Sequence, residues 1–330
     1  MEKILREISY AESIRECLMQ TMMEDRKVYL MGEDVGLYGG AFGVSEGLIS
    51  KIGPDRIIDT PIAEQGIVGV AIGASLLGMR PIVEIMFSDF IMLSMDQISN
   101  QAAKLRYMFG GKAKVPIVIR APGGGGIGLA AQHSQSLEAM LLNTAGLKIV
   151  MPSSAYDVKG LLLSAIKDDN PVIFLEHKLL YQTKGNVPED LYQIPLGKAD
   201  IKRKGDDITV IATSYMVHKA LKVAENLEKE NISVEVIDPR TIKPLDIDLI
   251  IDSIKKTNKA LLVEEACYTG GFTCFVASEI MRYCFDHLDA PVRRVTSLDC
   301  PIPYEHNLEN AVIPDESKIE EGIREVLGYY

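Results

Sequence analysis

The sequence predicts an α/β protein with two doubly wound domains, one larger and one smaller. Near-continuous apolar runs such as RPIVEIMF and PVIFLEH alternate with helix-like stretches in the first half. This alternation is typical of a parallel sheet covered by helices on both faces. The second half repeats it on a smaller scale, and 330 residues exceed what one hydrophobic core usually supports.

The first half contains the longer set of expected elements. The expected strands are KVYLMGE, RIIDT, RPIVEIMF, VPIVIRAP, LKIVMPS and PVIFLEH. The expected helices are IVGVAIGASLLG, MDQISNQAAKLRYMF and AYDVKGLLLSAIKDD. The pattern breaks after Leu179, where prolines and charged residues indicate a linker over residues 186–205. We therefore expect the first domain to span residues 1–185.

The second domain is expected over residues 206–330. Its expected strands are DITVIAT, ISVEVID, KALLVEE and VRRVTSLD. Its expected helices are MVHKALKVAENLEKEN, DIDLIIDSIKKT and FTCFVASEIMRYCFDHL. The shorter strands and the fewer elements predict a smaller α/β domain of the same kind.

Charge and composition exclude several classes of function. The formal net charge of −11 argues against nucleic acid or an anionic membrane as a general partner. No apolar run reaches the roughly 18 residues that span a bilayer, and the charged start MEKILREISY has no cleavable signal pattern, so we expect a cytoplasmic protein. The five cysteines lack CxxC spacing and the five histidines lack HxxxH pairing, which argues against a transition-metal site.

The run DTPIAEQG, residues 59–66, places Glu64 near the start of a helix rich in glycine and alanine. Thr60 is expected to cap this helix and Pro61 to be its first residue. A glycine inside a helix costs roughly 1 kcal/mol relative to alanine, so the several glycines predict the close approach of another helix. Glu64 is either an ordinary first-turn acid favoured by the helix dipole or a functional carboxyl.

Two further side chains stand where ligands are commonly bound. Phe90 follows the strand RPIVEIMF, and open α/β sheets bind ligands at such strand ends, although a core phenylalanine is the alternative. His133 lies in the small-residue loop AAQHSQS. Its imidazole is suited to proton transfer or to donation toward a substrate oxygen, although a structural role is the alternative.

A glycine tract follows the strand VPIVIRAP. Gly123, Gly125 and Gly128 satisfy the G-x-G-x-x-G pattern, which by itself suggests a dinucleotide-binding dehydrogenase. No acidic residue is convincingly placed to bind a ribose. We therefore interpret the tract as a flexible loop bordering an active site.

Read in order, TPIAEQG, FSDF, AAQHSQS, PVIFLEHKLLY and DPRTIKPLD resemble the β subunits of the E1 component of 2-oxo acid (pyruvate) or acetoin dehydrogenase complexes. The resemblance covers nearly the whole chain. It implies that the larger domain binds the pyrimidine of thiamine diphosphate and that the smaller one is transketolase C-terminal-like. It also implies that Glu64 hydrogen-bonds the aminopyrimidine, that Phe90 and Ile62 contact its ring, and that His133 faces the reacting carbon.

The same resemblance implies a second subunit. The chain has neither a GDG motif nor GxxxxGK[ST], so an α subunit is expected to hold Mg²⁺ and the diphosphate in an α₂β₂ heterotetramer. The two-carbon unit would pass to the lipoyl group of an E2 dihydrolipoyl acyltransferase. Residues matching K⁺ ligands in related β subunits are Ile117, Ala165, Asp168 and Asn170. An oxygen-only set suits a hard cation, and an ordinary polar helix end is the alternative.

The substrate is less constrained by the residues. NQAAKLRYMFGGKAKVP and KGNVPEDLYQIPLGKADIK are more similar to acetoin-type β subunits, whereas GEDVGLYGG lacks an insertion that many of those carry. Pyruvate and branched-chain 2-oxo acids are therefore the alternatives to acetoin. A hypothesis from another class is a non-catalytic scaffold subunit.

Overall fold

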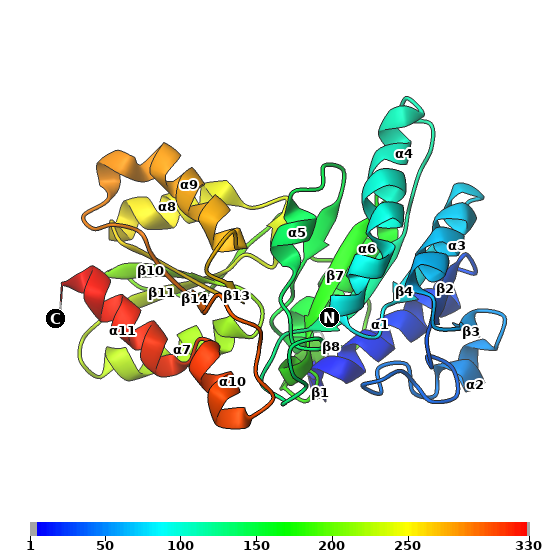
Figure 1. The fold of residues 1–330 in the computed structure, drawn as a ribbon, viewed down its shortest axis with the longest axis horizontal. Helices are drawn as coiled ribbons and strands as arrows, with labels where there is room; N and C mark the ends of the chain where they lie inside the picture. Colours follow the sequence, from blue (N-terminus) through cyan, green and yellow to red (C-terminus); the bar gives the residue numbers. More distant parts are fainter. Residues whose placement is uncertain (1–4, 329–330) are drawn as a thin grey trace. The chain divides into compact units, whose positions relative to one another are not determined.

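The computed structural model describes residues 5–328, which form two compact α/β units. Unit 1 contains the chain up to Gly123 together with Met140–Leu196. Unit 2 contains Gly124–Ala139 and the chain from Gly197 onward. Figure 1 shows that each unit has its own strands flanked by helices, which confirms the predicted fold class.

The sheet of unit 1 has the strand order β6-β7-β5-β4-β2-β3, and every neighbouring pair runs parallel. These strands correspond to the six apolar runs of the first half. They are β2 (Val28–Gly32), β3 (Ile57–Asp59), β4 (Arg80–Glu84), β5 (Val118–Gly123), β6 (Lys148–Val150) and β7 (Val172–His177). All residues of β2 and β7 are buried, because helices cover both faces.

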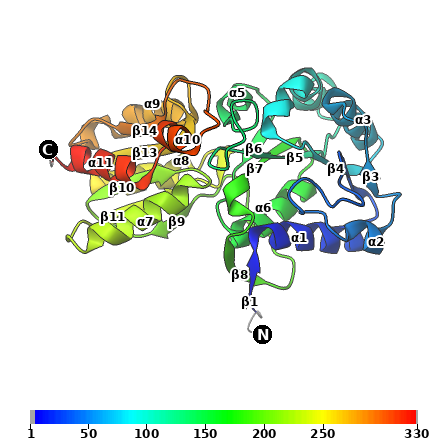
Figure 2. The same ribbon diagram turned by 60° about the horizontal axis from the view of Figure 1, so that its bottom comes forward.

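The helices of unit 1 lie on both sides of this sheet. α1 packs beside α6, whereas α3 packs on β4 and lies across the strands from them (Figure 2). The helical elements are α1 (Tyr10–Glu24), α2 (Leu48–Ile52), α3 (Glu64–Leu76), the 3₁₀ helix η1 (Ser88–Ser94), the π turn η2 (Gln97–Ala102), α4 (Ala103–Met108), α6 (Ala155–Lys167), the 3₁₀ helix η3 (Lys178–Leu180), and α5 (Glu138–Leu142), whose first two residues belong to unit 2.

The start of α3 differs from the expectation. Helix α3 begins at Glu64, and Ala63 is its N-cap residue with φ −163° and ψ 71°. The prediction that Thr60 caps the helix and Pro61 opens it is therefore wrong. Residues 60–63 are not helical and include a bend at Ile62, so the carboxyl of Glu64 belongs to the first helical residue itself.

Two short strands occupy the region predicted as a linker. β8 (Lys184–Pro188) pairs antiparallel with β1 (Leu5–Ser9) in unit 1. β9 (Asp200–Arg203) pairs antiparallel with β11 in unit 2. Both strands are only partly buried and contain few apolar residues, and for this reason the sequence did not indicate them.

The sheet of unit 2 has the strand order β14-β13-β10-β11-β9, with parallel pairs except at the β9 edge. The further elements are β10 (Ile208–Ala212), α7 (Met216–Glu228), β11 (Val234–Asp238), β12 (Thr241–Lys243), α8 (Ile247–Thr257), β13 (Ala260–Cys267), α9 (Phe272–Cys284), the 3₁₀ helix η4 (Phe285–His287), β14 (Arg293–Ser297), α10 (His306–Val312) and α11 (Glu316–Leu327). Between Leu5 and Gly328, no helix is both long and apolar enough to cross a membrane.

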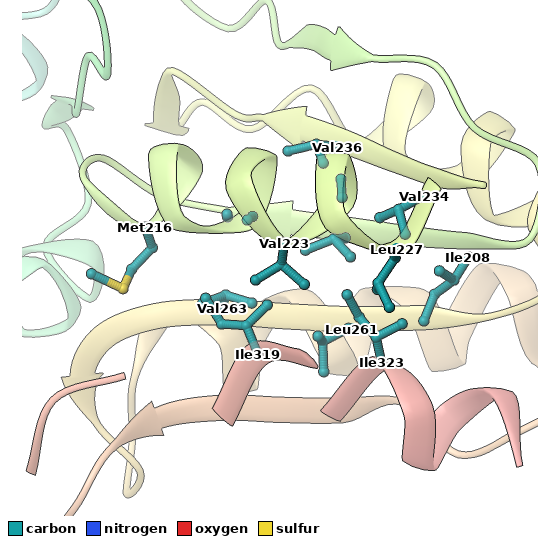
Figure 3. Close-up of a cluster of buried hydrophobic side chains, with 14 of the residues drawn as sticks. Ile208, Met216, Val223, Leu227, Val234, Val236, Leu261, Val263, Ile319 and Ile323 are labelled. Atoms are coloured by element: carbon teal, nitrogen blue, oxygen red, sulfur yellow. The ribbon is translucent and has the colours of Figure 1, made fainter. Parts of the chain in front are cut away.

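The core of unit 2 lies between its sheet and the pair α7 and α11. Figure 3 shows Val223 of α7 and Ile319 of α11 directed toward Leu261 and Val263 of β13. All four side chains are at most 1% exposed. Burying such a side chain contributes about 1.5–3 kcal/mol, so this cluster stabilises unit 2 with its own core.

Candidate active site

Glu64 is buried at the N-terminus of α3, where it is only 6% exposed. The unpaired amide groups of a helix N-terminus carry partial positive charge and favour a carboxylate. A carboxyl held there has a fixed position and little water around it. Glu64 is therefore placed to exchange a hydrogen bond with a ligand at the carboxyl ends of β2 and β3.

A second carboxyl, Glu33, lies beside Glu64 and follows β2. Burial, together with the charges of Glu64 and Asp34, raises the pKa of Glu33. Among residues 5–328, no hydrogen-bond partner is found for Glu33 Oε1 or for the buried hydroxyl of Thr60. A buried polar atom without a partner costs about 1–3 kcal/mol, so these atoms indicate a place that a polar ligand completes.

The sequence did not lead us to Glu33. A signal was present, because Glu33 ends the expected strand KVYLMGE, and carboxyl ends of parallel strands meet at one edge of a sheet. Its proximity to Glu64 follows from the parallel pairing of β2 with β3, in which Gly32 lies opposite Asp59.

Phe90 lies in η1, which packs against α3. Its ring meets that of Phe87 edge to face, with centroids 5.9 Å apart and an interplanar angle of 84°. Phe90 is half-buried, and Ile62 is 81% exposed two residues before Glu64. The structure thus brings Glu64 and Phe90 onto neighbouring elements, with apolar surface left open.

His133 lies in unit 2, whereas Glu64 and Phe90 lie in unit 1. The half-buried His133 is in the loop before α5, and its backbone N–H donates to the Ala130 carbonyl at 3.3 Å. Residues 124–139 pack with unit 2, although the predicted boundary at residue 185 assigns them to the first domain. His133 is therefore positioned by the glycine-tract segment.

The glycine tract is anchored by two carboxylates of unit 2. The Gly125 N–H donates to Glu265 at 2.6 Å, and the N–H groups of Gly126 and Gly128 donate to the two Glu309 oxygens at 2.7 and 3.0 Å. In a dinucleotide site these amides would face a phosphate. Here carboxylates of the protein accept their hydrogen bonds, which argues against dinucleotide binding and against free movement at these three residues.

Glu138 opens α5 five residues after His133 and is almost fully buried. Burial and the nearby Glu264 and Glu265 raise the pKa of Glu138 to about 8. Glu264 in turn accepts hydrogen bonds from Thr273, including one from its backbone N–H at 3.1 Å. The sequence did not indicate this acidic group, because its members come together only in the folded unit.

The residues predicted to bind K⁺ gather where α6 ends. One Asp168 oxygen accepts from the Asn170 backbone and side-chain amides at 2.8 and 2.7 Å, and the other pairs with Lys148. The carbonyls of Ala165 and Ile117 each accept one backbone hydrogen bond. Asn170 Oδ1 accepts from the Arg106 guanidinium at 2.8 Å. The two side chains of the set thus already pair with Lys148 and Arg106, and the two backbone carbonyls, each with a second lone pair, are the oxygens left for K⁺.

The comparisons with known proteins agree with this architecture. Residues 6–184 match the family model "Transketolase, pyrimidine binding domain", and residues 197–319 match "Transketolase, C-terminal domain". The chain therefore belongs to the transketolase-like family that joins these two domains. A solved structure titled "Split gene transketolase, inactive beta4 tetramer" shares the fold, with a TM-score of 0.79 and 22% identity over 98% of this chain and 99% of that chain.

Within that family, the chain belongs with the β subunits of dehydrogenase E1 components. It is 48% identical to pyruvate dehydrogenase E1 component subunit beta of Rickettsia felis, over 98% of this chain and 99% of the relative. It is 48% identical to 2-oxoisovalerate dehydrogenase subunit beta of Bacillus subtilis (97% and 98% covered). It is 45% identical to the B. subtilis acetoin:2,6-dichlorophenolindophenol oxidoreductase subunit beta (98% of both chains).

Proposed function

We propose that this chain works with an α subunit in a thiamine-diphosphate-dependent E1 component that acts on pyruvate or acetoin and passes the two-carbon unit to the lipoyl group of E2. The observation that carries the proposal is the buried Glu64 carboxyl at the N-terminus of α3, beside the Glu33 oxygen that has no hydrogen-bond partner in the part of the chain that the structure describes. Membership in the E1 β family supports the same conclusion.

Thiamine diphosphate, when bound, supplies a carbon nucleophile and an electron sink that protein side chains lack. The role proposed for Glu64 is to exchange a hydrogen bond and a proton with N1′ of the aminopyrimidine. Glu33, whose pKa is raised by burial and by Glu64, keeps its proton to a higher pH than an ordinary glutamate. A protonated Glu33 carboxyl can then donate a hydrogen bond to a polar group bound beside Glu64.

The apolar side chains serve to hold the ring and to exclude water. In this proposal Phe90 stacks on the aminopyrimidine and Ile62 packs on it. An aromatic pair adds about 0.5–1.5 kcal/mol beyond the burial of area. The half-burial of Phe90 and the exposure of Ile62 leave both with surface for such a contact. His133 is assigned the transfer of a proton at the reacting carbon and at the incoming lipoyl group.

Helix α3 supports the proposed assembly. Apart from the backbone of its own helix, an ideal Cβ added at Gly73 would meet no atom of residues 5–328 within 4 Å, while Val70 and Leu77 are 62% and 88% exposed. An apolar helix face with glycines allows another helix to approach closely. We assign this face to subunit contacts in an α₂β₂ heterotetramer, in which the α subunit holds Mg²⁺ and the diphosphate. A cytoplasmic location and a structural K⁺ at Asp168 and Asn170 belong to the same proposal.

Pyruvate, acetoin and 2-oxoisovalerate are named in relatives of nearly equal similarity, so identity alone does not select among them. Branched-chain 2-oxo acids are therefore the alternative substrates. Dye-linked oxidation by the complex that co-purifies with the tagged chain, with Mg²⁺ and thiamine diphosphate, separates the three classes.

The decisive variant is Glu64→Gln in that complex. We expect activity to fall at least about 100-fold, since general acid–base groups contribute about 10²–10⁴-fold. Glu316→Gln is the matched control, because Glu316 is also the first residue of a helix but is exposed. Full activity of Glu64→Gln would refute the catalytic role of Glu64 and favour a non-catalytic scaffold subunit.

A further inference from the structure

A fully buried guanidinium lies in the sheet of unit 1, away from any role given above. Arg120 of β5 is 0% exposed and donates to both carboxylate oxygens of Glu176 in β7, at 2.7 and 2.8 Å. It also donates to Glu84 at 2.6 Å, the residue opposite it in β4. Three adjacent parallel strands thus hold this cluster rigidly, since each side chain comes from a different strand.

Tyr181 extends the cluster toward the loops. Its hydroxyl donates at 2.7 Å to Glu176 Oε2, the same oxygen that accepts from Arg120 Nη2. Burial raises the pKa of Tyr181 well above its usual range, so the hydroxyl keeps its proton and stays a donor. The hydrogen bond fixes the outer end of the ring, and this ring stacks on Phe42, with centroids 5.3 Å apart and an interplanar angle of 25°.

The loop that carries Phe42 is also packed on the cluster. Gly40, with φ +81°, lies so close to Glu84 that an added Cβ would be 2.8 Å from its Oε1. Arg15 donates to the carbonyl of Val44 at 3.2 Å and to that of Gly43. Phe42 therefore has a fixed backbone as well as a stacked ring.

Phe42 transmits this position to the candidate cofactor site. Its ring meets Phe87 edge to face, with centroids 5.8 Å apart and an angle of 83°. Phe87 meets Phe90 in the same way, and its carbonyl accepts the Phe90 N–H at 3.0 Å. The ammonium of Lys178 lies 5.6 Å from the Phe87 ring centroid and contributes a cation–π contact.

We propose that Tyr181 and Phe42 are positioning residues, which transmit the rigidity of the Arg120 cluster through Phe87 to the ring of Phe90. This proposal rests on the proposed function, in which Phe90 stacks on the aminopyrimidine. A ring held in place binds a flat ligand without first losing rotamer freedom. Substitutions that loosen these ring contacts should therefore weaken cofactor binding, while kcat at saturating cofactor stays unchanged.

The test is a calorimetric titration of thiamine diphosphate into the cofactor-free complex that co-purifies with the tagged chain, which measures the Kd for the cofactor. We expect Tyr181→Phe and Phe42→Leu each to raise the Kd for thiamine diphosphate by about threefold to tenfold. A tenfold rise corresponds to about 1.4 kcal/mol. kcat at saturating cofactor should stay within about twofold, because the reacting groups are untouched.

Tyr192→Phe is the matched control. It also removes a tyrosine hydroxyl, which donates to the Tyr156 carbonyl at 2.7 Å, from a ring stacked on another aromatic. Its Kd should equal that of the wild type. A double-mutant cycle of Phe42→Leu with Phe90→Ala should be non-additive, since Phe42 acts only through the Phe90 ring.

The outcomes separate the two proposals. If Phe90→Ala weakens binding but Phe42→Leu and Tyr181→Phe do not, or if the cycle is additive, the positioning role is overturned. If Phe90→Ala itself leaves Kd unchanged, Phe90 does not stack on the cofactor as the proposed function requires. Tyr181 and Phe42 then have no cofactor contact to position. The melting temperatures of all variants report loss of stability. Tyr192→Phe should lower the melting temperature as Tyr181→Phe does, but without raising Kd.

Discussion

Replacing Arg120 by methionine removes the countercharge of two buried carboxylates, and we predict a loss of about 4 kcal/mol in the free energy of unfolding at pH 7. The guanidinium makes three hydrogen bonds of 2.6–2.8 Å to Glu84 and Glu176, and none of these three side chains is more than 6% exposed. Removing one partner of a buried ion pair typically costs about 3–5 kcal/mol.

The magnitude can be worked from protonation. The folded variant can protonate a buried glutamate that has lost its countercharge. In the unfolded chain that glutamate has a pKa near 4.3, so keeping it protonated at pH 7 costs about 1.36 × (7 − 4.3), or about 3.7 kcal/mol. At pH 5 the same step costs only about 1 kcal/mol. Burial raises the pKa of Glu84, and Glu176 loses both hydrogen bonds of its bidentate pair. The destabilisation should therefore shrink markedly as the pH falls.

The assay is urea unfolding of the full chain at fixed protein concentration, at pH 5 and at pH 7. Arg324→Met is the control, because Arg324 also binds two carboxylates, Glu230 and Glu320, but at the surface. Its midpoint should stay close to that of the wild type at both pH values. The reasoning is refuted if Arg120→Met behaves like Arg324→Met at pH 7, or if its loss is the same at pH 5.

Three further predictions concern pH, assembly and ion binding. The pKa of Glu138 is raised to about 8, so the folded chain binds a proton that the unfolded chain releases, and stability falls as pH rises from the usual glutamate value toward 8. Glu138→Gln should thus melt higher than the wild type at pH 8.5 and nearly equally at pH 4.5, and a pH-independent difference would contradict this. In Gly73→Leu the new Cβ meets no atom of residues 5–328 within 4 Å outside the backbone of its own helix. The variant should therefore keep the melting temperature of the β chain but lose co-purification of the α subunit, and unchanged recovery of that subunit would exclude α3 from the interface. Replacing Na⁺ by K⁺ should raise the melting temperature of the wild type but not of Asp168→Ala, and an equal response of the two would remove the K⁺ assignment.

Local patterns in the sequence were sufficient for the architecture. Buried parallel strands such as β2 and β7 consist of consecutive apolar residues, because both faces of the sheet are covered, and this leaves a run that can be read directly. Edge strands such as β8 were missed, since only part of each is buried. The start of α3 was misplaced, because Thr60 and Pro61 are typical of helix starts but the helix here begins only at Glu64, after the non-helical residues 60–63.

The sequence by itself determined the α/β class and the family, and it singled out Glu64, Phe90 and His133, whose roles stay predictions. Only the tertiary structure placed Glu33 beside Glu64, because that proximity depends on which strands are neighbours. It also showed that carboxylates 140 and 183 residues away accept the hydrogen bonds of the glycine tract. The physical reason is that periodicity and turn chemistry act between residues close in the chain, whereas charge partners, burial and pKa are set by groups that meet only when the strands assemble.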